Sequence, residues 1–209
     1  MNRRPLNEVL TIKYAFELGF AAPAAIILTE RNGIDMINLR LIAPVKSDES
    51  EFNDMMREWS SADENIYTDV FTRYKPSFDD FLTHLNKCRS STGLAENVVP
   101  NTTLILRDDA GRIYGGVTIR HYLNAHLNNY GGHIGMGIRP SERGKGYELH
   151  MFRLAVIRAR ELGISKLLIT YEKDNLIMDE IMCAVGALYD STVYSESVEK
   201  EIDRYWLAT

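Results

Sequence analysis

The segment 139–148 restricts what this chain can fold into more than any other part of the sequence. It sets two glycines between an apolar strand pattern and a long amphipathic helix pattern. Gly144 and Gly146 remove side chains where the backbone must turn and where a ligand can come close. The first amides of the following helix have no partners inside the helix, and the positive end of its dipole lies there. The segment therefore predicts a seat for a phosphate or pyrophosphate, with Arg143 and Lys145 adding positive charge at its rim.

Two well-known phosphate-binding motifs do not fit this segment. A Walker loop has a glycine, four further residues and then Gly-Lys-Ser or Gly-Lys-Thr, and the sequence contains no such run. A dinucleotide fingerprint needs a third glycine, but Leu149 stands at that position after Gly144 and Gly146. A glycine-rich turn that binds nothing is the plain alternative. The strand pattern before it, Pro140 and the long helix after it favour a ligand.

The hydrophobic periodicity from Asn38 onward alternates between strand and helix. Apolar residues at i, i+3, i+4 and i+7 mark helix faces, and short apolar runs bounded by turn residues mark strands. Ser77, with Asp80 three residues on, is placed to cap one helix. The fold class is therefore α/β, a mixed sheet with helices on its faces. The expected order is a strand at 39–44, helices at 52–59 and 78–85, a hairpin of strands at 103–106 and 113–120, a strand at 132–138, a helix at 147–162, a strand at 167–170, a helix at 174–185 and closing strands at 188–194 and 202–207.

The first 37 residues have a helical pattern only, whereas strand and helix patterns alternate in the rest of the chain. The expected division is therefore a helical arm, 1–37, and a main domain, 38–209. Pro23 suits a first helical turn and Gly33 a C-terminal cap, which gives two short helices. A helix-turn-helix for nucleic acid is one interpretation of this arm. Packing on the main domain or a dimer contact is the other, and the lack of a basic face favours it.

Composition excludes several classes of protein. With 45 % hydrophobic and 25 % charged residues the chain can form a core, so wholesale disorder is excluded. The formal charge of −5 argues against bulk nucleic-acid binding. No apolar run reaches the roughly 18 residues of a membrane helix. Cys88 and Cys183 form neither a disulfide framework nor a metal pattern, which indicates a cytoplasmic location. His121 and His126, at i and i+5, do not have a helical zinc spacing, so no metal site is expected.

The run Arg143-Gly144-Lys145-Gly146-Tyr147-Glu148 resembles the coenzyme A pyrophosphate loop of the GNAT acyltransferases, Arg/Gln-x-x-Gly-x-Gly/Ala, at every position but the last. The element order from 38 to 209 is also similar to that family. A bacterial subgroup of predicted acetyltransferases is more similar still, at 119–124, 131–135, 138–147, 168–170 and 173–175. The resemblance implies a mostly antiparallel mixed sheet in which the strand at 132–138 splays from the strand at 167–171.

The resemblance also implies acetyl-CoA as the donor and an amine as the acceptor, by direct transfer. Such transfer needs two positioned reactants, an oxyanion donor and a base for the amine. The acceptor class, a small molecule or a peptide amine, stays open, as does a homodimer. The backbone of Gly137 and Ile138 would pair with the pantetheine arm, and Asn175 would touch the cofactor. The expected cofactor-binding residues are Gly137, Ile138, Arg139, Arg143, Gly144, Lys145, Gly146, Tyr147, Glu148 and Asn175.

Two residues depart from the family pattern. Glu148 replaces a glycine or alanine and would repel a pyrophosphate unless it points away. Met182 stands where many members have a tyrosine that protonates the leaving thiolate, which methionine cannot do. A non-catalytic CoA-binding or interaction protein on the same fold is therefore the alternative function.

Three residues are the candidates for proton transfer. His133, on the expected strand at 132–138, could be a base near neutral pH, and the alternative is a histidine bonded within the sheet. His121 ends the preceding strand and could face a substrate pocket or support the loop at 124–130 instead. Tyr189 could take the place of the missing proton donor.

Overall fold

The computed structural model describes residues 38–62, 77–90, 94 and 97–209. The expected helical arm at 1–37 lies outside the described residues. The elements are, in chain order, β1 Arg40–Ile42, the helical turn η2 Lys46–Asp48, α3 Glu49–Ser61, α5 Phe78–Cys88, β2 Asn101–Arg107, β3 Ile113–Arg120, the π-helical turn η3 Leu127–Gly131, β4 Ile134–Ile138, the turn η4 Pro140–Glu142, α6 Tyr147–Glu161, β5 Lys166–Glu172, α7 Leu176–Val185, β6 Leu188–Ser195 and β7 Lys200–Ala208.

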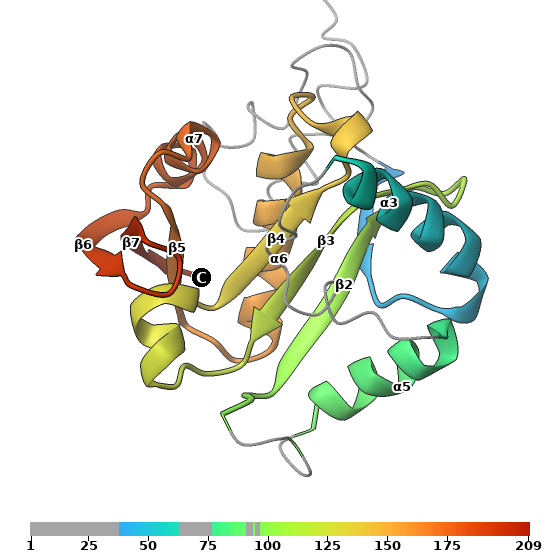
Figure 1. The fold of residues 1–209 in the computed structure, drawn as a ribbon, viewed down its shortest axis with the longest axis horizontal. Helices are drawn as coiled ribbons and strands as arrows, with labels where there is room; N and C mark the ends of the chain where they lie inside the picture. The colour runs from blue at the N-terminus through green and yellow to red at the C-terminus, as the bar shows by residue number, and fades with distance from the viewer. Residues whose placement is uncertain (1–37, 63–76, 91–93, 95–96) are drawn as a thin grey trace, which may run out of the picture.

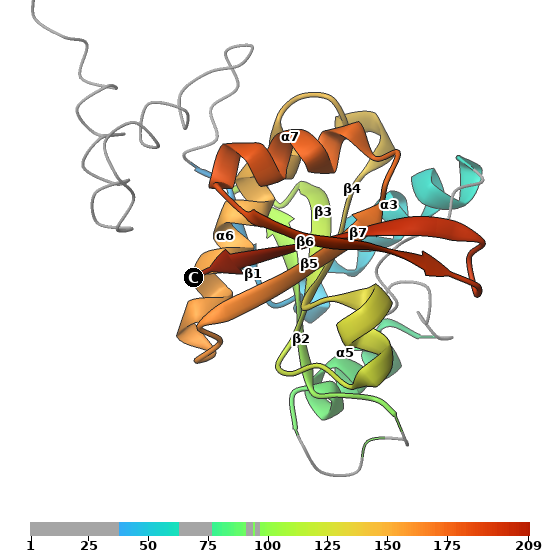
Figure 2. The same cartoon turned by 90° about the vertical axis from the view of Figure 1, so that its left-hand side faces the viewer.

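The strands form two sheets with helices on both faces (Figure 1). One sheet has the order β1-β2-β3-β4 and the other the order β5-β7-β6, and every ladder is antiparallel. Helix α6 lies behind the larger sheet, whereas α3 and α5 lie in front of it. Figure 2 shows the three strands of the smaller sheet toward the viewer with α7 above them. The predicted fold class, α/β with a mostly antiparallel sheet flanked by helices, is confirmed, and the described strands form no parallel ladder.

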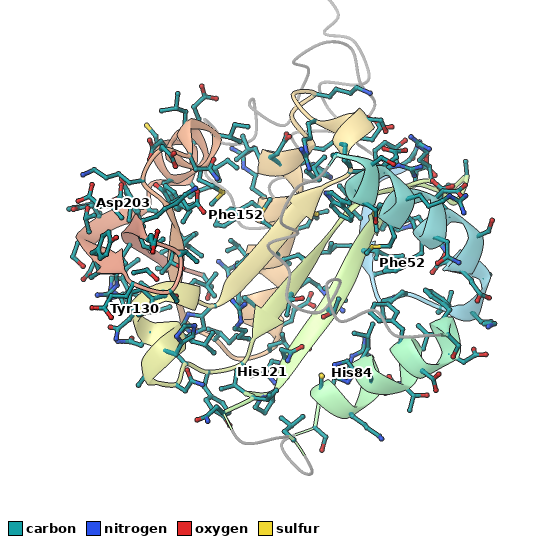
Figure 3. All side chains as sticks on the ribbon, in the orientation of Figure 1. Phe52, His84, His121, Tyr130, Phe152 and Asp203 are labelled. Carbon is teal, nitrogen blue, oxygen red and sulfur yellow. The ribbon has the colours of Figure 1, made fainter. Side chains whose placement is uncertain are left out.

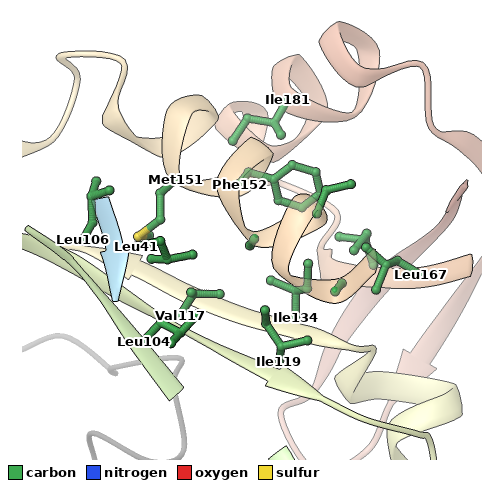
Figure 4. Packing of buried hydrophobic residues seen from close by; sticks show 14 of the residues in the cluster. Leu41, Leu104, Leu106, Val117, Ile119, Ile134, Met151, Phe152, Leu167 and Ile181 are labelled. Atoms are coloured by element: carbon green, nitrogen blue, oxygen red, sulfur yellow. The ribbon is translucent and has the colours of Figure 1, made fainter. Parts of the chain in front are cut away.

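Strand alternation supplies both faces of the larger sheet with apolar side chains. On one face Leu104, Leu106, Val117 and Ile119 meet Phe152 of α6 in the main core, which Figure 4 shows from close by. On the opposite face a smaller cluster joins the sheet to α3 and α5. It consists of Phe52, Met55, Trp59, Phe78, Phe81, Leu85, Ile105 and Ile113.

Short apolar strands are typical of the middle of a sheet, but β5, the strand expected at 167–170, lies at the edge of the smaller sheet. β5 has a ladder to β7 on one side, but on the other side it forms none with β4, although β4 lies beside it. Its apolar character has another source, because Leu167 and Ile169 pack into the main core and Leu168 is fully buried. The break between β4 and β5 divides the sheet, and it is the feature from which the candidate site is built.

Candidate functional site

β4 and β5 are joined at one end only. The His133 N–H donates to the Leu168 carbonyl at 2.8 Å, and the Leu168 N–H donates to Nδ1 of His133 at 2.9 Å. Thr170 Oγ1 donates to the Tyr130 carbonyl at 2.8 Å, which ties η3 to β5 at the same place. From this joint the two strands run toward Ile138 and Glu172 in separate sheets. The β4 edge that faces β5 therefore carries backbone groups that no ladder uses.

The ladder between β3 and β4 identifies those groups. The Arg139 N–H donates to the Tyr114 carbonyl, and the register pairs Gly116 with Gly137. In an antiparallel ladder, hydrogen-bonded pairs alternate with pairs whose N–H and C=O groups point away. Gly137 therefore directs its N–H toward β3, whereas Met136 and Ile138 direct theirs toward β5. Of the two residues expected to offer backbone to a pantetheine arm, Ile138 has the required direction and Gly137 does not. Met136 was missed, because only the register reveals it.

The turn after β4 leads into the N-terminus of α6. Gly144 has φ +70° and Gly146 has φ +89°, a backbone region that glycine adopts readily. Gly146 is the N-cap of α6, and no side chain caps the helix there. The first amides of a helix have no partners within it, so those of Tyr147, Glu148 and Leu149 remain available. The turn thus presents backbone donors at the place where the sequence predicts a seat for an anion, and the binding of an anion there stays a prediction.

Glu148 points toward this seat. Its Oε1 accepts a hydrogen bond from the Gly144 N–H at 3.2 Å, so a carboxylate of the protein already engages one donor of the turn. The sequence left open whether Glu148 points away, and the structure places it over the turn. A bound pyrophosphate would have to share the site with this charge or displace it.

The cations of the turn are also engaged within the protein. Arg143 Nε donates to the Ile138 carbonyl at 3.0 Å, and Lys145 Nζ donates to Glu142 at 2.9 Å. Arg139 is buried, with 3 % of its surface exposed, and its guanidinium reaches Glu51 and Glu58 of α3. Arg139, expected to bind cofactor, therefore holds the turn from behind rather than lining its outer surface.

Asn175 and Met182 lie on α7. The Asn175 side chain accepts from the Met178 N–H at 3.2 Å as the N-cap of the helix, which engages its oxygen. Met182 is buried, with 1 % of its surface exposed. The Tyr171 hydroxyl on β5 donates to Asp179 of the same helix at 2.9 Å. Burial and the hydrogen bonds to Tyr205 and Asp179 raise the pKa of Tyr171, which makes this tyrosine a poor proton donor at neutral pH.

The three candidates for proton transfer do not meet at one place. His133 Nδ1 accepts the hydrogen bond that holds β5. Burial and the nearby Arg120 lower the pKa of His133. Protonation of Nδ1 would break the hydrogen bond to Leu168. Holding β5 is the structural role that the sequence left open. His121 lies at the end of the sheet opposite to the glycine turn (Figure 3). The five-residue strand β4, which separates these two ends, is roughly 17 Å long. Its Nε2 bonds Thr102 Oγ1 at 2.9 Å. Tyr189 is 57 % exposed on β6, two strands from β5, and bonds Thr192.

His150 of α6 gives a pH dependence that can be measured. Burial and the nearby Arg153 lower its pKa to about 4, and Nε2 is buried without a hydrogen-bond partner. The unfolded chain binds a proton on His150 more readily than the folded protein does. The contribution of the neutral His150 to the free energy of unfolding is therefore fully present above pH 6.5 and is lost as the pH falls toward 4. We expect His150 to make the protein about 2 kcal/mol less stable at pH 5 than at pH 7.

Urea unfolding at pH 7 and pH 5 measures this difference in stability. His150→Leu should remove most of the part of the difference that His150 contributes. The exposed His126 is the matched control, because His126→Leu should leave the pH dependence unchanged. His121 and His133, whose pKa values are also lowered, remain in both variants and contribute equally. An identical pH dependence in His150→Leu and in the unmodified protein would contradict the assignment.

Two further findings concern the described residues. No group of three or more histidine, cysteine, aspartate or glutamate side chains in them is arranged to hold a metal ion. Among the same residues, no helix combines the length and the apolar character that crossing a bilayer requires.

Comparison with known proteins identifies the fold. No family model matches the sequence, and no curated protein sequence matches it significantly. Solved structures do match. A mutant of the spermidine N-acetyltransferase SpeG from Vibrio cholerae superposes with a TM-score of 0.58 at 15 % identity, over 82 % of this chain and 94 % of that one. RimL, a ribosomal L7/L12 α-N-protein acetyltransferase in complex with coenzyme A, gives 0.58 at 14 % identity over the same shares. A dodecameric SpeG from Vibrio cholerae gives 0.56 at 14 % identity. The chain has the fold of the GNAT acetyltransferases.

Proposed function

We propose that this protein is an N-acetyltransferase that transfers the acetyl group of acetyl-CoA directly to an amine. The observation that carries the proposal is a pair of backbone donor sets that no ladder and no helix uses. One lies on the open edge of β4, at Met136 and Ile138, and the other lies at the N-terminus of α6, directly after the glycine turn. The fold, shared with SpeG and RimL, supports an acetyltransferase in general.

The donor set fits a molecule that is extended at one end and doubly anionic at the other. A strand edge binds an extended amide-bearing chain in the way that it would bind another strand. A helix N-terminus with uncapped amides binds phosphate oxygens. Coenzyme A has both parts, a pantetheine arm and a pyrophosphate. We place the arm along Met136 and Ile138 and the pyrophosphate on the amides of Gly146, Tyr147 and Glu148.

The thioester supplies an activated acetyl group when acetyl-CoA is bound. The attacking amine forms the C–N bond as the C–S bond breaks, and the amine proton passes to solvent or to the leaving thiolate. The protein positions the reactants, and N–H groups on the open β4 edge, such as that of Met136, can donate to the carbonyl oxygen on which negative charge develops. No side chain is assigned as the base, because Nδ1 of His133 holds the joint and Nε2 of His121 bonds Thr102.

The alternative function is a CoA-binding protein without catalysis. The contact between Glu148 and the Gly144 N–H favours it, because it places a charge in the pyrophosphate seat. The buried Met182 at the position of a proton donor favours it as well.

Calorimetry followed by an amine panel separates the two functions. We expect acetyl-CoA to bind, and S-acetylpantetheine, which lacks the pyrophosphate, to bind far more weakly. Release of free thiol should then be followed with a polyamine such as spermidine and with a peptide carrying a free N-terminus, chosen from the substrates in the names of the matched structures. Binding with release supports the transferase, and binding without release supports the alternative. No binding of acetyl-CoA overturns both.

A further inference from the structure

We infer that Glu58 of α3 is a positioning residue for the cofactor turn, acting through Arg139 and through the backbone of Ser141. The inference rests on the proposed function, since the turn positioned is the one to which the pyrophosphate is assigned. It gives a second role to α3, for which the sequence pattern predicted only an apolar face that packs on the sheet.

The two carboxylate oxygens of Glu58 have different tasks. Oε1 accepts from Arg139 Nε at 2.6 Å, and Oε2 accepts from the Ser141 N–H at 3.2 Å. One side chain thus holds both Arg139, the residue after β4, and the helical turn η4 that starts the loop. Burial acts to raise the pKa of Glu58, but the hydrogen bonds from Ser141 and Arg139 outweigh it, so the pKa is lowered. The carboxylate is therefore ionised at neutral pH and paired with Arg139.

A second carboxylate of α3 supports the same arginine. Glu51, two helical turns before Glu58, accepts from Arg139 at 2.5 Å and from the Ile113 N–H at 3.3 Å. The Arg139 side chain is 4 % exposed, so these carboxylates compensate the burial of its charge. Arg112 extends the set, because it contacts both Glu51 and Glu142, and Glu142 holds Lys145. The ion pairs therefore lead from α3 to the centre of the glycine turn.

Trp59, the neighbour of Glu58, connects α3 with the strand edge as well. Its ring lies over Gly137, where an added Cβ would be 3.3 Å from Cζ2 of the ring. Adjacent residues of α3 thus rest on β4 and hold the loop after β4. A displacement of α3 would alter both the strand edge and the turn, so the position of the helix is transmitted to the proposed cofactor site.

The chain contains a matched control for a purely structural ion pair. Asp48, the residue before α3, is buried and pairs with Arg107 on β2, and it contacts no residue of the turn. Loss of either carboxylate is destabilising, because Arg107 loses Asp48 and the buried Arg139 keeps Glu51 alone. Only the loss of Glu58 frees Arg139 Nε and the Ser141 amide.

The test compares Glu58→Gln with Asp48→Asn. We expect Glu58→Gln to weaken acetyl-CoA binding about tenfold in calorimetry, with the KM for acetyl-CoA rising and the KM for the amine unchanged. Asp48→Asn should lower the melting temperature similarly and leave acetyl-CoA affinity within twofold. Arg139→Lys should reproduce the loss of affinity, and adding Glu58→Gln to it should cost little more, since both act on one contact.

The outcomes separate this inference from the function on which it rests. If the unmodified protein does not bind acetyl-CoA, the proposed function fails. If the unmodified protein binds but Glu58→Gln and Arg139→Lys bind equally well, the positioning role is overturned and the function stands. An equal loss of affinity in Asp48→Asn also overturns it, because any destabilisation of α3 would then suffice. Should Glu58→Gln not fold, Arg139→Lys alone decides between these results.

Discussion

Replacing Glu148 by alanine is expected to tighten the binding of acetyl-CoA about tenfold, which corresponds to ~1.4 kcal/mol. The Glu148 carboxylate engages the Gly144 N–H and lies over the turn to which the pyrophosphate is assigned. Two unit charges about 5 Å apart near a protein surface repel by roughly 3 kcal/mol before salt screening. Solvent and salt reduce this severalfold. Alanine removes the charge and frees the Gly144 amide for the ligand.

Two further variants show which property of Glu148 matters. Glu148→Gln keeps the size of the side chain and an acceptor oxygen, so it removes the charge alone and should give most of the gain. Glu161→Ala makes the same change in charge at the other end of α6, where the glutamate pairs with Arg158, and should leave affinity unchanged. The gain in Glu148→Ala should shrink as salt is added. Calorimetry that finds unchanged or weaker binding in Glu148→Ala would refute the assignment of the pyrophosphate to this turn.

Local pattern was sufficient to predict most helices and strands of the described chain. The i, i+3, i+4, i+7 spacing from Phe52 to Trp59 corresponds to α3. Ser77 caps α5 and accepts from the Asp80 N–H at 3.1 Å, as its position predicted. Gly163 follows the end of α6 with φ +81°. These features are set by residues close together in sequence, and for that reason periodicity and capping residues reveal them.

The features that define the site depend on distant residues and could not be read from local pattern. That Met136 rather than Gly137 directs its N–H to β5 follows from the register with β3, a property of two strands. The contact between Glu58 and Arg139 joins residues 81 positions apart. The role of His133 depends on Leu168, which is 35 positions away. A sequence shows which chemical groups are present, but their partners come from the topology.

Gly132→Ala is expected to destabilise the protein by about 3 kcal/mol, because Gly132 lies at the joint of the two sheets. It has φ +58° and ψ −169°, a backbone region that is essentially restricted to glycine and costs an alanine roughly 1–3 kcal/mol. An added Cβ would also lie 2.7 Å from the Leu168 carbonyl oxygen and 3.2 Å from the Thr170 N. These are backbone atoms of β5 that cannot rotate away, so the strands must separate, at a further cost of roughly 1–3 kcal/mol.

Gly186→Ala is the control for a glycine with positive φ and free space around it. Gly186 has φ +70° and ψ 32° at the end of α7, in the left-handed helical region, and nothing lies within 4 Å of a Cβ added there. This variant therefore meets only the smaller backbone cost of that region, without a steric cost, and should lose about 1 kcal/mol in urea unfolding. The difference between the variants measures the contact with β5 together with the more restricted backbone of Gly132. An equal loss in both would mean that β5 moves aside at no cost. The separation of the strands would then not be fixed by this joint, and the open edge of β4 would have to be held by α3 and the turn alone.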